Sequence, residues 1–178
     1  MREPPRRLRI PEWLILIGSS LFIAVLAISA YFEPDIRWLH FFQAWMYVAA
    51  ILLGLWGNRW GYFIGFSAAL LWDYANLFVT TFFMNGIEEL IRCASAGHQA
   101  RPDLLLAIPA WLSNLTLIVG CVWAYKRMRT KEPFDIVRLL LAFALTTGFF
   151  AGAMELFQPR YLAMFPELLH PRWPIIRP

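Results

Sequence analysis

Five long apolar stretches constrain this chain more than any other feature of its sequence. They cover residues 13–32, 38–56, 61–84, 104–125 and 137–157. A helix needs about 20 mostly apolar residues to cross the hydrocarbon core of a bilayer. Apolar residues make up 60% of the chain and charged residues 16%, which a water-soluble domain of this size cannot bury. The sequence therefore predicts a single-domain, all-α polytopic bundle integral to a membrane, with about five transmembrane helices.

Basic residues predict the orientation of this bundle. They cluster before the first stretch and after the fourth: Arg2, Arg6, Arg7, Arg9, Lys126, Arg127, Arg129 and Lys131. Four spans separate the two clusters, so both fall on one side of the membrane, and loops rich in Lys and Arg stay in the cytoplasm. We expect the N-terminus inside and the C-terminus outside, in a bacterial-type inner or plasma membrane. The basic excess then needs no nucleic-acid partner.

The connection after the third stretch has an amphipathic pattern. Residues 86–96 place apolar side chains at helical spacing, and Asn85 with Glu88 fits a capping-box pattern at their start. Gly97 is a plausible stop. The pattern predicts a short helix lying on the outer membrane surface.

The C-terminal tail, residues 158–178, combines five prolines with many apolar side chains. The prolines exclude a long helix. A free tail in water is rarely so apolar, so we expect this segment to contact the membrane surface or another protein subunit. The residues predicted to make that contact are Tyr161, Phe165 and Trp173.

A polar set lies in the middle of the predicted membrane. Asp73 is near the centre of the third stretch, where inserting a carboxylate costs about 2.5–3.5 kcal/mol. Asn76 and Thr80 follow on the same helical face, and Ser113 and Asn114 lie midway along the fourth stretch. Three interpretations stay open for this set. It could join helices by hydrogen bonds, line a solute or proton path, or contact a partner subunit.

All three histidines fall on the predicted outer side. Imidazole is a common metal ligand, so His40, His98 and His170 permit a metal site, and His40 permits a haem or a chlorophyll-type pigment. They come from separate segments, however, and no His-x-x-x-His spacing holds two of them on one helical face. Surface histidines without a ligand are the simpler interpretation. The sequence identifies no cofactor.

No catalytic motif accompanies these residues: the sequence contains no P-loop, no Gly-rich dinucleotide fingerprint and no Ser/His/Asp set. We therefore expect a non-catalytic accessory subunit of a larger membrane complex of respiratory, photosynthetic or transport type. The alternative is a small-solute carrier or substrate-binding transport subunit built around Asp73, which requires a cavity reaching Asp73 from the outer side. A second alternative is a membrane enzyme, or a metal or pigment binder, that uses the histidines.

Overall fold

A computed structural model of the chain describes residues 7–96 and 99–169. Within these residues the regular structure is helical and contains no strand. The long helices are α1 (Ile10–Phe32), α2 (Arg37–Leu55), α3 (Arg59–Phe78), α6 (Ala107–Lys126) and α7 (Asp135–Phe157). The shorter elements are the 3-10 turn η1 (Pro34–Ile36), α4 (Phe82–Ala96), α5 (Pro102–Leu105) and the 3-10 helix η2 (Pro159–Leu169).

Several of these helices are long and apolar enough to cross a membrane. Four segments in the described part of the chain meet this condition: Ile10–Phe32, Pro34–Leu55, Pro102–Lys126 and Asp135–Phe157. The pair α3 and α4 adds a fifth if its two helices, bent by 63°, count as one broken span. The predicted all-helical bundle is confirmed, with four to five helices long and apolar enough to cross a membrane where the sequence predicted about five.

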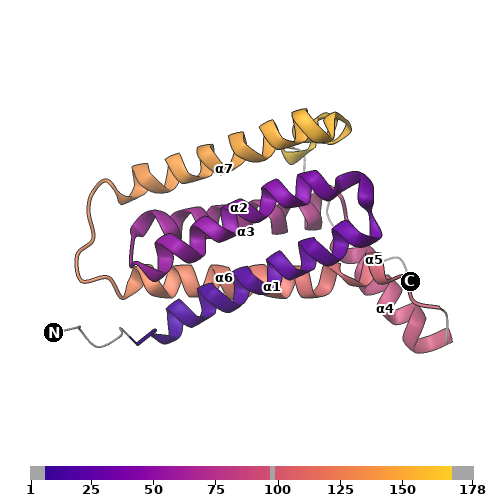
Figure 1. Cartoon of the computed structure of the whole chain (residues 1–178), viewed down its shortest axis with the longest axis horizontal. Coiled ribbons are helices and arrows are strands. Elements are labelled where there is room, and N and C mark those ends of the chain that lie inside the picture. The colour runs from indigo at the N-terminus through magenta and orange to yellow at the C-terminus, as the bar shows by residue number, and fades with distance from the viewer. Residues whose placement is uncertain (1–6, 97–98, 170–178) are drawn as a thin grey trace.

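Four helices pack around one another and the fifth lies beside them. α1 contacts α2 and α6, and α3 contacts the same two helices, which closes a ring of four (Figure 1). α7 lies outside this ring and packs against α3 and α2. Because α3 has neighbours on three sides, it can carry polar side chains without exposing them to lipid. This position explains how the helix with Asp73 fits into an apolar bundle.

The two ends of the bundle differ in character. The end that we call the basic end holds the start of α1, the α2–α3 turn at residues 56–58 and the α6–α7 connection at residues 127–134. The opposite end, which we call the pocket end, holds η1, residues 79–106 and η2. Each end is fastened by polar contacts between segments far apart in the sequence.

An ion-pair network fastens the basic end. Arg59 pairs with Glu132 at 2.6 Å and with Asp135 at 3.1 Å. Arg138 pairs with the same two acids at 2.6 and 2.9 Å. The Tyr125 hydroxyl adds a hydrogen bond to the second oxygen of Asp135. The network thus joins α3, α6 and α7, and it satisfies a carboxylate that is almost completely buried.

The third predicted span, residues 61–84, does not form one continuous helix. α3 ends at Phe78, and residues 79–81 break the chain before α4 begins. Thr81 has φ 54°, an uncommon conformation for a β-branched residue. The backbone N–H of Phe82 donates to Thr80 Oγ1 at 3.3 Å, so a threonine oxygen satisfies a donor at the start of α4.

The predicted start of the amphipathic helix was wrong because the break at residues 79–81 lets α4 begin earlier, at Phe82. Asn85 lies inside α4, and its backbone N–H already donates to the Thr81 carbonyl at 3.0 Å. The residues that precede and cap α4 are Thr80 and Thr81. They were not recognised in the sequence because apolar residues surround them on both sides. The predicted stop at Gly97 lies outside the described residues.

α1 and α6 cross at close range because glycines face the partner backbone. A Cβ atom on Gly18 would lie 2.7 Å from the Leu117 amide nitrogen and 2.8 Å from the Ser113 carbonyl oxygen. A Cβ atom on Gly120 would lie 2.9 Å from the Ile15 amide nitrogen. Small residues let helix backbones approach closely in membranes, where dispersion contacts drive association. The α1–α6 pair also makes the largest contact between any two described helices.

We predict that Gly18→Ala destabilises the protein by about 1–3 kcal/mol, because the added methyl group meets rigid backbone and the helices must separate. The matched control is Gly148→Ala on α7, where a Cβ atom would meet nothing within 4 Å. That change should be neutral or slightly stabilising, since alanine favours a helix over glycine by up to about 1 kcal/mol. Thermal unfolding of both variants in one detergent measures the difference, and equal melting temperatures would contradict the close-packing argument.

Candidate functional site

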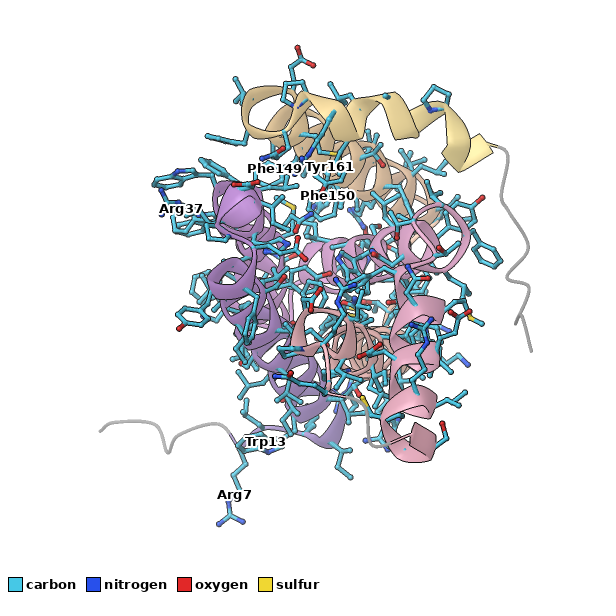
Figure 2. The ribbon with its side chains drawn as sticks, turned by 90° about the vertical axis from the view of Figure 1, so that its right-hand side faces the viewer. Arg7, Trp13, Arg37, Phe149, Phe150 and Tyr161 are labelled. Carbon is cyan, nitrogen blue, oxygen red and sulfur yellow. The ribbon has the colours of Figure 1, made fainter. Side chains whose placement is uncertain are left out.

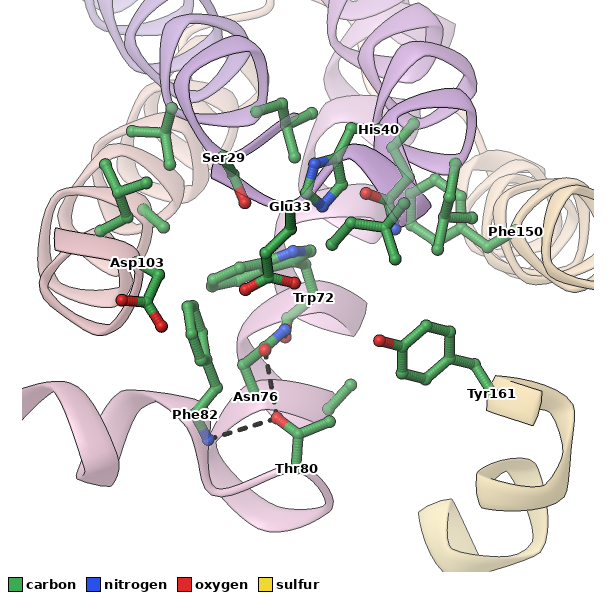
Figure 3. Close-up of a pocket in the computed structure, with 18 of the residues that line it drawn as sticks. Ser29, Glu33, His40, Trp72, Asn76, Thr80, Phe82, Asp103, Phe150 and Tyr161 are labelled. Carbon is green, nitrogen blue, oxygen red and sulfur yellow. Dashed lines mark hydrogen bonds between the residues drawn. The ribbon is translucent and has the colours of Figure 1, made fainter. Parts of the chain in front are cut away.

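A cavity of about 410 Å³ lies at the pocket end (Figure 3). Segments from α1 to η2 line it, and most of its wall is apolar. The aromatic residues in the wall are Trp72, Phe82, Phe150 and Tyr161. The polar and charged residues are Ser29, Glu33, His40, Gln43, Asn76, Thr80, Arg101 and Asp103. A concave, mainly apolar site with a few polar groups is the usual form of a small-molecule site.

Asn76 and Thr80 line one side of this cavity, as residues of α3 and of the break that follows it. The Thr80 hydroxyl donates to Asn76 Oδ1 at 3.1 Å, and Asn76 Nδ2 donates to the Trp72 carbonyl at 2.9 Å (Figure 3). Thr80 also accepts from the first N–H of α4. These bonds hold both side chains in the wall and shape the end of α3.

The carboxylates of the cavity differ in their partners. Asp103 accepts a hydrogen bond from the Arg101 guanidinium at 2.8 Å, and this contact raises the pKa of Arg101 above its usual value. The backbone N–H of Arg101 donates to the buried Glu89 at 2.9 Å. Glu33 points into the cavity near Trp72, and its side chain has no hydrogen bond or ion pair with the described residues. Glu33 is therefore the lining carboxylate that is available to a ligand.

Asp73 belongs to a separate buried group below the cavity. It lies one helical turn from Asn76, next to Asn114 of α6 and Tyr47 of α2, and it does not line the cavity. The Tyr47 hydroxyl donates to Asn114 Oδ1 at 3.0 Å. Asp73 Oδ1 and Asn114 Nδ2 have no hydrogen-bond partner among the described residues. The five predicted polar residues thus do not form one pocket.

Ser113 stands apart from both groups. Its hydroxyl donates to the Ala110 carbonyl of its own helix at 2.7 Å, and its backbone oxygen faces Gly18 of α1. It is part of the α1–α6 contact. Gln43, by contrast, lines the cavity, and its buried Oε1 atom lacks a partner among the described residues.

Aromatic packing connects the buried group to the cavity wall. Phe22 of α1 stacks on Tyr47 with ring centroids 4.3 Å apart and meets Trp72 edge-on at 5.0 Å. Phe22 and Tyr47 are completely buried, and Trp72 faces the cavity. The sequence analysis gave neither Tyr47 nor Glu33 a role in the site. The only sequence feature that could have pointed to Glu33 is its position at the end of an apolar stretch. Many acidic residues share this position, so it does not identify a binding residue.

The histidines do not come together as a ligand set. His40 lines the cavity, whereas His98 and His170 lie outside the residues that the structure describes. Within residues 7–96 and 99–169, no group of three His, Cys, Asp or Glu side chains could hold a metal ion. The metal and pigment hypothesis therefore gains no support from the described geometry.

Where it is described, the tail packs against this chain's own helices, and its predicted contact with a membrane or another subunit stays a prediction. Residues 159–169 form η2, and Tyr161 directs its hydroxyl into the cavity (Figure 3). Gln158 Nε2 donates to the Asp35 carbonyl, which fastens the start of η2 to η1. The Phe165 side chain and Trp173 lie outside the described part of the chain. Tyr161 is thus a wall residue of this chain's own cavity.

No protein-family model, curated protein or solved structure matched this chain.

We predict that Tyr47→Phe lowers the free energy of unfolding by about 1–3 kcal/mol, because Asn114 Oδ1 loses its donor while it stays buried. Tyr31→Phe is the matched control, since Tyr31 is 80% exposed and its hydroxyl has no hydrogen bond among the described residues. Denaturant titration in detergent compares the two variants. Equal stability of both would remove the argument that the Tyr47–Asn114 bond holds α2 on α6.

Proposed function

We propose that this protein is a small-molecule-binding membrane protein, a carrier or substrate-binding transport subunit, which takes its ligand at the pocket end. One observation carries the proposal: a mainly apolar cavity of about 410 Å³ contains a carboxylate, Glu33, that makes no hydrogen bond or ion pair with the described residues. The volume suits a ligand of modest size. Glu33 is half-buried and lies within electrostatic range of Arg101, but no hydrogen bond or ion pair with the described residues holds its carboxylate, so a cationic ligand would find a charged partner there.

The wall of the cavity supports a particular ligand class. Aromatic faces attract organic cations when the charge lies within about 6 Å of a ring centroid. Trp72, Phe82 and Tyr161 supply such rings close to Glu33. We therefore propose a small organic cation, an amine or a quaternary ammonium compound, with an apolar body.

The expected orientation places this cavity on the outer side of the membrane. The proposal rests on the positive-inside rule and on the concentration of basic residues at the opposite end. In this orientation α4, with its amphipathic pattern, lies on the outer surface beside the cavity entrance. The membrane is the inner or plasma membrane of a bacterial-type cell.

Matched probes test the ligand class. Benzyltrimethylammonium and its neutral isostere neopentylbenzene differ in charge at nearly the same shape. We expect the purified protein to bind the cation at least about tenfold more tightly, measured by quenching of tryptophan fluorescence. Glu33→Gln should weaken binding of the cation about tenfold and leave the neutral compound unchanged.

The control substitution is Asp35→Asn, which removes the same charge two residues away, in η1, outside the cavity lining. It should leave both affinities unchanged. Equal binding of the two probes, or equal loss in both variants, would exclude the cation site.

A second candidate function is the accessory subunit of a larger membrane complex. A specific surface favours it: Gly148 and Gly152 of α7 are exposed, and a Cβ atom on either would meet nothing within 4 Å. Glycines at this spacing form close contacts between membrane helices. α7 also lies at the edge of the bundle, with its outer face open to another subunit.

Mild purification from the native membrane tests this candidate. If α7 holds a partner subunit, Gly152→Ile should abolish its co-purification, as detected by mass spectrometry, because the branched side chain separates the helices. Ala27→Ile, at an exposed position of α1, is the control and should retain the partner. A wild-type protein that purifies without a stoichiometric partner would exclude the accessory role.

A further inference from the structure

A second hollow, of about 460 Å³, lies at the basic end. The start of α1, the α2–α3 turn and the end of α6 surround it. Its lining includes three arginines, Arg9, Arg127 and Arg129, from segments far apart in the sequence. Trp56 and Met128 add apolar surface to the same hollow.

The acids near this hollow form no ion pair with its arginines among the described residues. Glu132 and Asp135 are occupied by Arg59 and Arg138, which do not line the hollow. Glu12 lines it and accepts the backbone N–H of Arg9, so the lining carries three positive charges and one negative charge. Among the described residues, no carboxylate lies within 4 Å of the three lining guanidinium groups. The excess of positive charge around the hollow is unfavourable, and a bound anion would offset it.

The position of the hollow indicates where such an anion comes from. It lies where α1 begins and where α2 and α6 end, which is the level of the lipid headgroups if these helices cross a membrane. Trp56 is 74% exposed there, and the Arg127 guanidinium lies over the Trp123 ring at 4.9 Å. Trp13, near the start of α1, lies at the same end, and Figure 2 shows Arg7 extending away from the helices. Exposed tryptophans and arginines together are typical of this interface.

We propose that this hollow binds the phosphate group of an anionic phospholipid from the leaflet at the basic end. The planar fork of a guanidinium group matches two phosphate oxygens, so Arg127 and Arg129 suit a phosphodiester. The apolar side chains of Trp56 and Met128 favour a lipid over a free phosphate ion, because they accommodate the glycerol and the first methylenes. This site is independent of the cavity at the pocket end.

Competition between two lipids tests the proposal. Immobilised protein is equilibrated with detergent micelles that contain equal amounts of dioleoylphosphatidylglycerol and dioleoylphosphatidylcholine, then washed, and the retained lipids are quantified by mass spectrometry. We expect at least about fivefold enrichment of phosphatidylglycerol, which decreases as NaCl is raised because salt screens the arginines. Arg127→Gln and Arg129→Gln should each reduce its retention about three- to tenfold.

The matched control is Arg92→Gln, which removes one positive charge at the pocket end and should leave the retention of phosphatidylglycerol unchanged. Equal retention of the two lipids by the wild-type protein would overturn the proposal without any variant. If Arg92→Gln lowered the retention of phosphatidylglycerol as much as Arg127→Gln and Arg129→Gln, the proposal would also be overturned. Displacement of phosphatidylglycerol by millimolar inorganic phosphate would identify a free-anion site and overturn the lipid assignment.

Discussion

The close approach of α1 and α6 at Gly18 and Gly120 is the contact on which the other helices depend. It joins α1 to α6, although the contacting residues of the two helices lie more than eighty residues apart in the sequence. α2 and α3 complete the ring between them. Lipid tails are as apolar as the helix surfaces, so contact area and backbone proximity must provide the stabilisation that water exclusion provides in a soluble protein. Because the ring is closed, Asn114 of α6 can meet Tyr47 of α2 beside Asp73.

The break after α3 creates the cavity. A helix that continued to residue 84 would fill this end of the bundle with side chains, whereas α4 turns away by 63°. Gly86 then brings α4 close to the Leu104 carbonyl, since a Cβ atom there would lie 2.8 Å from it. The space between α3, the start of α4 and α1 stays open, with Glu33 and Tyr161 directed into it (Figure 3). Irregular backbone at such a place is expected only where protein or a polar cavity surrounds it.

Polar residues in this chain serve different purposes at different depths. At the basic end Arg59, Arg138 and their acids hold three helices together, while other arginines there have no acid partner. In the middle, Tyr47 and Asn114 form a bond between helices next to Asp73, whose buried oxygen lacks a partner. At the pocket end, Glu33 faces open space. The predicted mid-membrane set is thus divided between the cavity wall, the buried group around Asp73 and the α1–α6 contact.

The sequence by itself determined the all-helical bundle and the approximate apolar spans, because apolar runs of a given length are local features. It could not determine that Ser113 joins the α1–α6 contact, that Tyr161 turns into the cavity, or that Thr80 and Thr81 end α3 early. It also gave no sign that Glu33 would face a cavity without a partner. Those outcomes depend on which helices become neighbours and on the rotation of each about its axis, and only the tertiary packing decides both.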